Sequence, residues 1–133
     1  MTIEHINPPG LPKPIGYSHV VASSGGRTVY VAGQGAYDAK GKIVGPGDHQ
    51  AQTTQVFRNL VTALEAAGAT PEQVVFSTMY VVGLDADTLQ AFVRGMNEAL
   101  DGRSMPPTAS TLVGVERLAF DEMLVEVNAI AVL

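Results

Sequence analysis

The sequence contains no cysteine, and charged residues make up only 16% of its 133 positions. Without cysteine, the chain forms no disulfide, has no thiol nucleophile and offers a metal no thiolate ligand. Basic residues are scarce as well: eight Lys and Arg stand against 13 Asp and Glu, which gives a formal net charge of −5. Because the basic residues form no cluster, the composition disfavours a nucleic-acid-binding protein.

Apolar runs of membrane-spanning length are absent too, and the first ten residues, MTIEHINPPG, lack the basic start and apolar core of a signal peptide. We therefore expect a cytoplasmic protein that does not enter a membrane. The chain is nevertheless 46% hydrophobic, which favours one folded domain over residues 1–133. With so few charges to cover the surface, part of the apolar surface should be buried against other subunits.

Two segments have the apolar spacing of amphipathic helices. The first is residues 49–67, where Asp48 stands at the N-cap position. The second is residues 86–100, which either Asp85 or Asp87 can cap.

Strands are expected where β-branched and apolar residues form short runs between turn signals. Residues 2–16 hold four of the eight prolines and are expected to be irregular. The turn residues 23–26 predict a hairpin between the first two long strands, and Asp121 and Glu122 lie in the turn of a second hairpin at the C-terminus. The expected strands are residues 17–22, 27–33, 74–83, 108–118 and 123–132, with a short one around Ile43.

This order of elements predicts an α+β fold with a mixed sheet and both helices on one face of it. The strands at residues 74–83 and 123–132 are apolar on both faces. Because two helices can cover only one face, the other face must be buried by something else. Self-association is the simplest way to bury it.

Glu126 stands out because it lies in the middle of the last strand. Alternation places Glu126 on one face with Leu124 and Asn128, while Val125 and Val127 point to the other. A carboxylate inside a sheet is costly to desolvate unless it is paired or used in chemistry. Glu126 is therefore a candidate catalytic residue, or else a structural carboxylate that pairs across a subunit interface.

Several segments resemble the Rid/YjgF family, the reactive-intermediate (imine/enamine) deaminases. Residues 107–115, PTASTLVGV, are similar to that family's P-A-R-[ST]-x-V-x-V, and residues 124–132, LVEVNAIAV, to its [LV]-[VI]-E-[IV]-x-[AV]-I-A. Residues 16–21, 31–34 and 59–68 resemble further family segments in the same order. The resemblance implies a chorismate-mutase-like fold and a homotrimer with a central barrel and intersubunit clefts.

The resemblance also implies roles for particular residues. Glu126 corresponds to the family's glutamate, which handles water and the substrate nitrogen, with Tyr17 and the backbone at Gly33 beside it. The family's arginine, a clamp for the substrate carboxylate, falls on Ser110, whose hydroxyl cannot replace a guanidinium. His19 is a candidate neighbour of the site, since it follows Tyr17 in the first strand. Alternatively, Tyr17 only packs its ring and Gly33 only marks a strand end.

The function that follows is that of a divergent Rid-family enzyme, which hydrolyses an imine or enamine other than a simple α-imino acid. The alternative is a non-catalytic small-molecule-binding or interaction protein on the same trimeric scaffold. No cofactor is expected. His5, His19 and His49 show no ligand spacing to one another, so no metal site is expected either.

Overall fold

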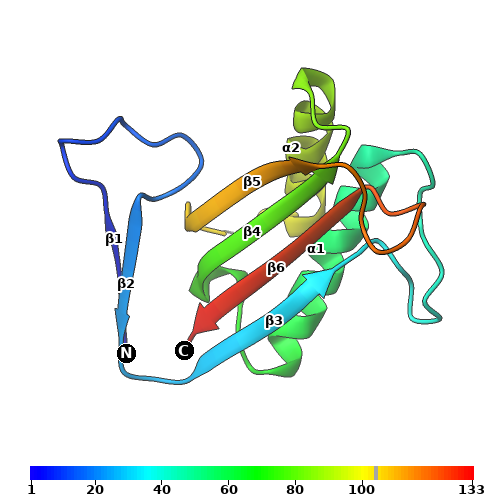
Figure 1. The fold of residues 1–133 in the computed structure, drawn as a ribbon. Coiled ribbons are helices and arrows are strands. Elements are labelled where there is room, and N and C mark those ends of the chain that lie inside the picture. Colours follow the sequence, from blue (N-terminus) through cyan, green and yellow to red (C-terminus); the bar gives the residue numbers. More distant parts are fainter. Residues whose placement is uncertain (104) are drawn as a thin grey trace.

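The computed structural model describes residues 1–103 and 105–133 and confirms the α+β fold. Strands β3, β6, β4 and β5 form a mixed four-stranded sheet in that order, and β1 and β2 form a separate hairpin (Figure 1). The elements are β1 (Thr2–Ile6), β2 (Val20–Ser24), β3 (Thr28–Gln34), α1 (His49–Ala66), the 3-10 turn η1 (Pro71–Gln73), β4 (Val74–Val82), α2 (Ala86–Leu100), β5 (Ala109–Val115) and β6 (Val125–Val132). None of the described helices is both long and apolar enough to cross a membrane.

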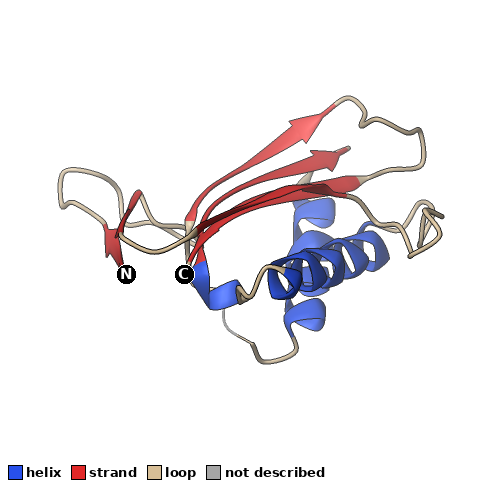
Figure 2. Cartoon of the chain, turned by 90° about the horizontal axis from the view of Figure 1, so that it is seen from below, coloured by secondary structure: helices blue, strands red, loops and turns tan. Residues whose placement is uncertain are grey.

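Both helices lie on one side of the sheet, as Figure 2 shows. The core forms between them and the sheet, where the rings of Phe57 on α1 and Phe92 on α2 meet edge to face, 5.7 Å apart. Strand β6 supplies the middle of the core with four buried side chains, Val125, Val127, Ala129 and Ala131. The predicted arrangement of two helices on one face is therefore confirmed.

Carboxylate caps begin both helices. The Asp48 side chain accepts a hydrogen bond from the backbone N–H of Ala51 at 2.9 Å. At α2 the cap is Asp85, which accepts from the Thr88 N–H at 2.8 Å, while the Asp85 N–H donates to the Thr88 hydroxyl. The hydrogen bond from the Thr88 backbone holds the pKa of Asp85 below its usual range. The cap therefore stabilises α2 at neutral pH and is lost as the pH falls through that lowered pKa.

Two strand pairings differ from those predicted. The turn at residues 23–26 does not join a hairpin, because β2 pairs with β1 and β3 pairs with β6. The expected irregular lead-in is wrong for Thr2–Ile6, and β2 begins at Val20 rather than Tyr17. At the C-terminus β5 pairs in parallel with β4, and β6 lies between β3 and β4. The helix α2 between β4 and β5 is the crossover that a parallel pair requires.

Gln52 joins α1 to the beginning of β6. Its side chain is fully buried, and its amide nitrogen donates to the carbonyls of Gly45 and Glu122 at 3.2 and 2.8 Å. Its carbonyl oxygen accepts from the Leu124 N–H at 2.8 Å. This amide therefore satisfies three backbone groups and fixes the place where β6 begins.

The second face of the sheet, here called the open face, has no helix on it; in Figure 1 the helices lie behind the sheet. Large apolar side chains are exposed there. Tyr30 of β3 is 77% exposed, Phe76 of β4 43% and Val113 of β5 37%. An apolar face of this kind favours contact with another protein surface.

We predict that chains associate through the open face as homotrimers. Phe76→Asp places a charge on this face and should give monomers at micromolar concentration, because a carboxylate is costly to bury. Leu89→Asp is the matched control: Leu89 lies on α2 and is 42% exposed, close to the 43% of Phe76. Sedimentation velocity measures the mass. A monomeric wild type, or equal loss of assembly in both variants, contradicts the prediction.

Candidate functional site

Glu126 and Gly33 meet on the open face. Glu126 lies opposite Tyr80 of β4, and Gly33 lies on the other side of β6, where the β3–β6 register shifts between Val31 and Gln34. A Cβ atom built at Gly33 would come within 2.7 Å of the Glu126 Cδ and 3.0 Å of its Cγ. Gly33 is therefore the residue that leaves room for the glutamate side chain.

Glu126 is also the single charged residue in the four described strands of the sheet. No hydrogen bond or ion pair within the described part of the chain involves its carboxylate, and its side chain is only partly buried. An ion pair within the chain therefore does not account for this residue. Among the described residues, no group of three His, Asp or Glu side chains lies close enough to hold a metal ion.

A hollow of about 260 Å³ lies on the open face beside Gly33. Its polar side chains are Asn128 and Tyr30, and Phe76 and Ile130 are its large apolar ones. Asn128 is a polar residue that the sequence analysis did not select. The signal for it was the strand alternation, since it lies two positions after Glu126 and shares its face.

Tyr17 and Ser110 line a different pocket, of about 370 Å³, on the helix side of the sheet. The two hydroxyl-bearing side chains have no hydrogen-bond partner for their hydroxyls within the described residues. The rest of the lining is apolar or glycine: Ile15, Gly16, Met79, Leu89, Phe92, Val93, Met96 and Leu112. The structure thus brings Tyr17 to Ser110 but separates both from Glu126 and Gly33 in the same chain.

The segment that carries Tyr17 is held by hydrogen bonds to the beginning of β5. The Ser18 N–H donates to the Thr108 carbonyl at 2.9 Å, and the Ser18 hydroxyl donates to the Pro107 carbonyl. His19 packs its ring edge-on against Tyr17, at 5.2 Å, and its Nε2 donates to the Pro12 carbonyl at 2.6 Å. His19 therefore packs against the Tyr17 ring and is not among the residues that line the pocket.

The strand register of β5 places Ser110 and its neighbour Ala109 on opposite faces of the sheet. Ser110 lies beside the buried Ser77, whereas Ala109 lies beside Phe76 and so faces the open side with Glu126. Val113 and Val115 match the two valines of P-A-R-[ST]-x-V-x-V, and counting back from them reaches Ser110 at the arginine. Ser110 thus lies with Tyr17 in the helix-side pocket, whereas Ala109 faces the Glu126 side of the same chain.

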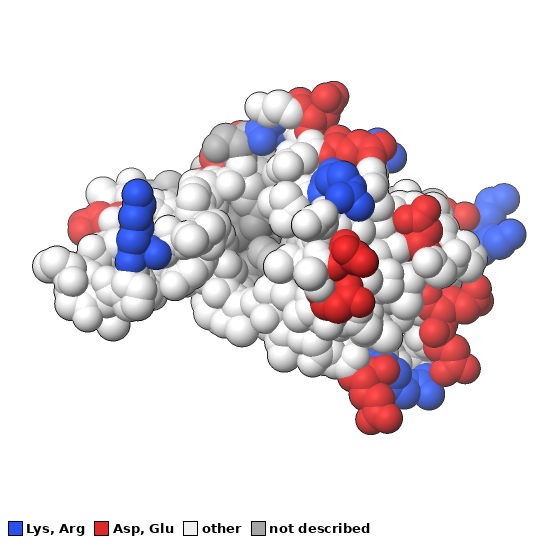
Figure 3. All heavy atoms as spheres, turned by 90° about the horizontal axis from the view of Figure 1, so that it is seen from above, with Lys and Arg blue, Asp and Glu red and all other residues white. Residues whose placement is uncertain are grey.

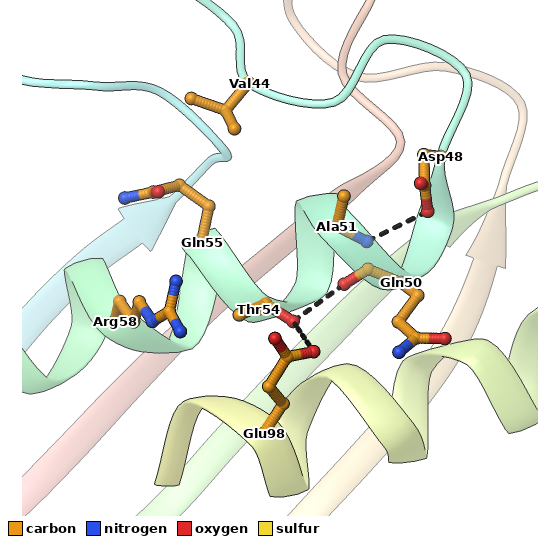
Figure 4. A pocket seen from close by; sticks show the side chains of 8 residues that line it. All are labelled: Val44, Asp48, Gln50, Ala51, Thr54, Gln55, Arg58 and Glu98. Atoms are coloured by element: carbon orange, nitrogen blue, oxygen red, sulfur yellow. Dashed lines mark hydrogen bonds between the residues drawn. The ribbon is translucent and has the colours of Figure 1, made fainter. Parts of the chain in front are cut away.

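A polar groove of about 450 Å³ runs between α1 and α2, away from all of these residues (Figure 4). In it the Thr54 hydroxyl donates to the Gln50 carbonyl at 3.0 Å and lies 3.3 Å from the Glu98 carboxylate. Arg58 lines the same groove. The Thr54–Glu98 contact joins the two helices, and none of the predicted site residues lines the groove.

Comparison with known proteins agrees with the fold and the motif order. Residues 11–133 match the family described as Endoribonuclease L-PSP. The chain belongs to this family, also called Rid/YjgF. It is 37% identical over 124 residues to a RutC family protein of Pyrococcus horikoshii, covering 90% of each chain. It is 33% identical over 135 residues to a RutC family protein of Synechocystis, covering 100% of this chain and 98% of the other.

Solved structures of Rid-family proteins have the same fold. The protein YyfB of Yersinia pestis, described as a Rid-family protein of unknown function, is 40% identical and superposes with a TM-score of 0.87 over the whole of both chains. RidA of an Antarctic Psychrobacter is 26% identical, with a TM-score of 0.67 over 98% of this chain and 99% of the other. The Rid/YjgF fold is therefore established for this chain.

In this Rid-family protein, Gly33→Ala should destabilise the fold by about 0.5–1.5 kcal/mol, because the new methyl group displaces the partly exposed Glu126 side chain from its rotamer. In a Glu126→Ala background the same change should cost much less. Chemical denaturation of the four proteins in the double-mutant cycle measures the coupling.

Gly35→Ala is the control for that cycle. A Cβ atom at Gly35 would contact Met123 and Tyr37 instead, at 2.6 and 2.7 Å. Its cost should therefore be the same with and without Glu126. Equal costs of Gly33→Ala in both backgrounds would show that the Gly33–Glu126 contact is not made in solution.

Proposed function

We propose that this protein hydrolyses an imine or enamine intermediate that carries no free α-carboxylate. The observation that carries the proposal is the unpaired Glu126 carboxylate at Gly33, on a sheet whose described strands hold no cation. Membership in the Rid/YjgF family supports the same chemistry. No cofactor is needed for it.

Hydrolysis adds water to the carbon of the C=N bond and releases ammonia, leaving a C=O bond. Glu126 would take a proton from the attacking water and deliver a proton to the departing nitrogen. The backbone at Gly33 lies against the Glu126 side chain and would orient the reacting groups. Tyr17 lines the pocket on the helix side, so it could act beside Glu126 only from a neighbouring chain of the proposed trimer.

Ribonuclease activity fits this chain less well, although the family description and several similar structures carry that name. RNA binding depends on Lys and Arg side chains that neutralise phosphates. The chain has a formal net charge of −5. On the face drawn in Figure 3 the basic side chains stand apart from one another. A small-molecule substrate is therefore favoured.

A second candidate function is small-molecule binding without turnover. The pocket of about 370 Å³ that Tyr17 and Ser110 line supports it, because its lining is apolar apart from two free hydroxyls. Most ligand pockets combine apolar walls with a few polar groups in this way. Under this alternative, removal of the Glu126 carboxylate would not change ligand binding in the helix-side pocket.

Glu126→Gln should lower imine hydrolysis by about a hundredfold or more, because the amide keeps the shape but cannot exchange protons. The measurement is the rate of ammonia release from an imine generated in solution. Glu98→Gln, the same change in the groove between the helices, should leave the rate unaltered. Full activity of Glu126→Gln would refute the catalytic role, and failure of that variant to fold or assemble would assign Glu126 a structural one.

Ser110→Arg should raise kcat/KM for small α-imino acids by about tenfold or more, since one charge-assisted hydrogen bond contributes about 1.5–3 kcal/mol. The wild-type protein is expected to use these substrates poorly. Ala109→Arg is the matched variant and should give no gain, because Ala109 lies on the opposite face of β5 from the pocket that holds Ser110 and Tyr17. A gain from Ala109→Arg alone would refute Ser110 as the counterpart of the family's arginine.

A further inference from the structure

The side chain of Asn128 is held in one orientation. Its Oδ1 accepts a hydrogen bond from the Thr78 N–H at 2.8 Å. The Ser77 hydroxyl donates to the backbone carbonyl of Asn128 at 2.7 Å. A backbone N–H can donate only to the oxygen of the side-chain amide, so the nitrogen Nδ2 must point away from the Thr78 N–H. The contact with Thr78 therefore presents two N–H donors on the side away from β4.

Those donors are free to bind a ligand. No hydrogen bond among the described residues uses the Asn128 Nδ2, and the residue is only partly buried. Asn128 lines the hollow of about 260 Å³ on the open face, together with Gly33. Because Gly33 contacts the Glu126 side chain, the hollow has a neutral donor and a carboxylate on its borders.

The charges around this hollow disfavour a simple anionic ligand. The described strands of the sheet contain no Lys or Arg, and their one charge is the negative charge of Glu126. Arg117, which follows β5, is paired with Asp121 at 3.0 Å. A carboxylate bound here would find no cation on the described strands and would be repelled by Glu126. A neutral carbonyl oxygen, in contrast, is the acceptor that an amide N–H₂ group prefers.

We propose that Asn128 is a specificity residue that anchors the carbonyl oxygen of a neutral substrate, an imine or enamine next to a carboxamide. Glu126 then faces the carbon of the C=N bond, two residues and about 7 Å along the strand. The choice of an imine rests on the proposed function. The recognition of a neutral carbonyl by Asn128 is a claim about binding, and it can be tested without turnover.

The test uses two ligands of nearly equal size, pyruvamide and pyruvate, which are a neutral and an anionic analogue of the expected carbonyl product. Each is titrated into the wild-type protein while the NMR shifts of residues around Asn128 are followed. Pyruvamide should bind about tenfold or more tightly than pyruvate, a difference of about 1.4 kcal/mol. Equal or tighter binding of pyruvate, or binding of neither ligand at millimolar concentration, would overturn the proposal.

Asn128→Asp tests the residue itself. The aspartate keeps an oxygen for the Thr78 N–H but has no donor, so pyruvamide binding should weaken about tenfold, as expected for one lost hydrogen bond. Asn97→Asp adds the same charge on α2 and should change nothing. Unchanged pyruvamide binding in Asn128→Asp would remove Asn128 from the site.

The two proposals fail in different ways. Selective binding of pyruvamide together with no hydrolysis of the matching imino amide would support the Asn128 anchor and refute the hydrolase. Hydrolysis of that imino amide together with equal binding of the two ligands would support the hydrolase and refute the Asn128 anchor. The comparison of the two ligands on the wild-type protein also decides the charge preference without any variant, so a misfolded Asn128→Asp would not leave it untested.

Discussion

The alternation of side chains along β6 is the constraint on which the rest of the structure depends. The strand lies between β3 and β4, and its side chains Val125 and Val127 fill the core beneath α1. The residues between them therefore face the open side, and Glu126 is one of them. A slip of one residue would carry this carboxylate into the core and expose the valines. Gln52 opposes such a slip, because its buried amide binds the Leu124 N–H where the strand begins.

Local signals predicted the helices, the Asp48 cap and the α+β class, and they narrowed the second cap to Asp85 or Asp87, because each of these depends on residues close together in the sequence. The strand pairings did not follow from local signals. The residues at 23–26, which include Gly25 and Gly26, suit a hairpin turn, yet β2 pairs with β1, and β3 pairs with β6, where Val29 and Val31 join the core. The parallel pairing of β4 with β5 could have been predicted, since a helix between two strands normally forms a right-handed crossover.

The candidate site was predictable in part from alternation and in part from the family resemblance. Glu126 was selected as a carboxylate in mid-strand and Gly33 through the resemblance, and the structure places them in contact. Tyr17 and Ser110 also came from the resemblance, and the structure brings them together in the helix-side pocket. Asn128 was missed because the family pattern leaves its position open. Its place two residues after Glu126 nevertheless put it on the same face, so the residues alone carried the signal.

The open face combines the proposed assembly surface with the proposed site, and this explains why it is so weakly charged. Tyr30 and Phe76 are exposed apolar side chains on this face, and both also line the hollow that Asn128 borders. A neighbouring chain that covered them would wall the hollow and exclude water from it. Hydrogen bonds to Asn128 and electrostatic interactions with the Glu126 carboxylate are stronger in such an environment. The same contact would bury any charge on this face, and a buried charge without a function lowers stability. The single carboxylate of the sheet therefore indicates a function whose benefit exceeds the free-energy cost of its desolvation.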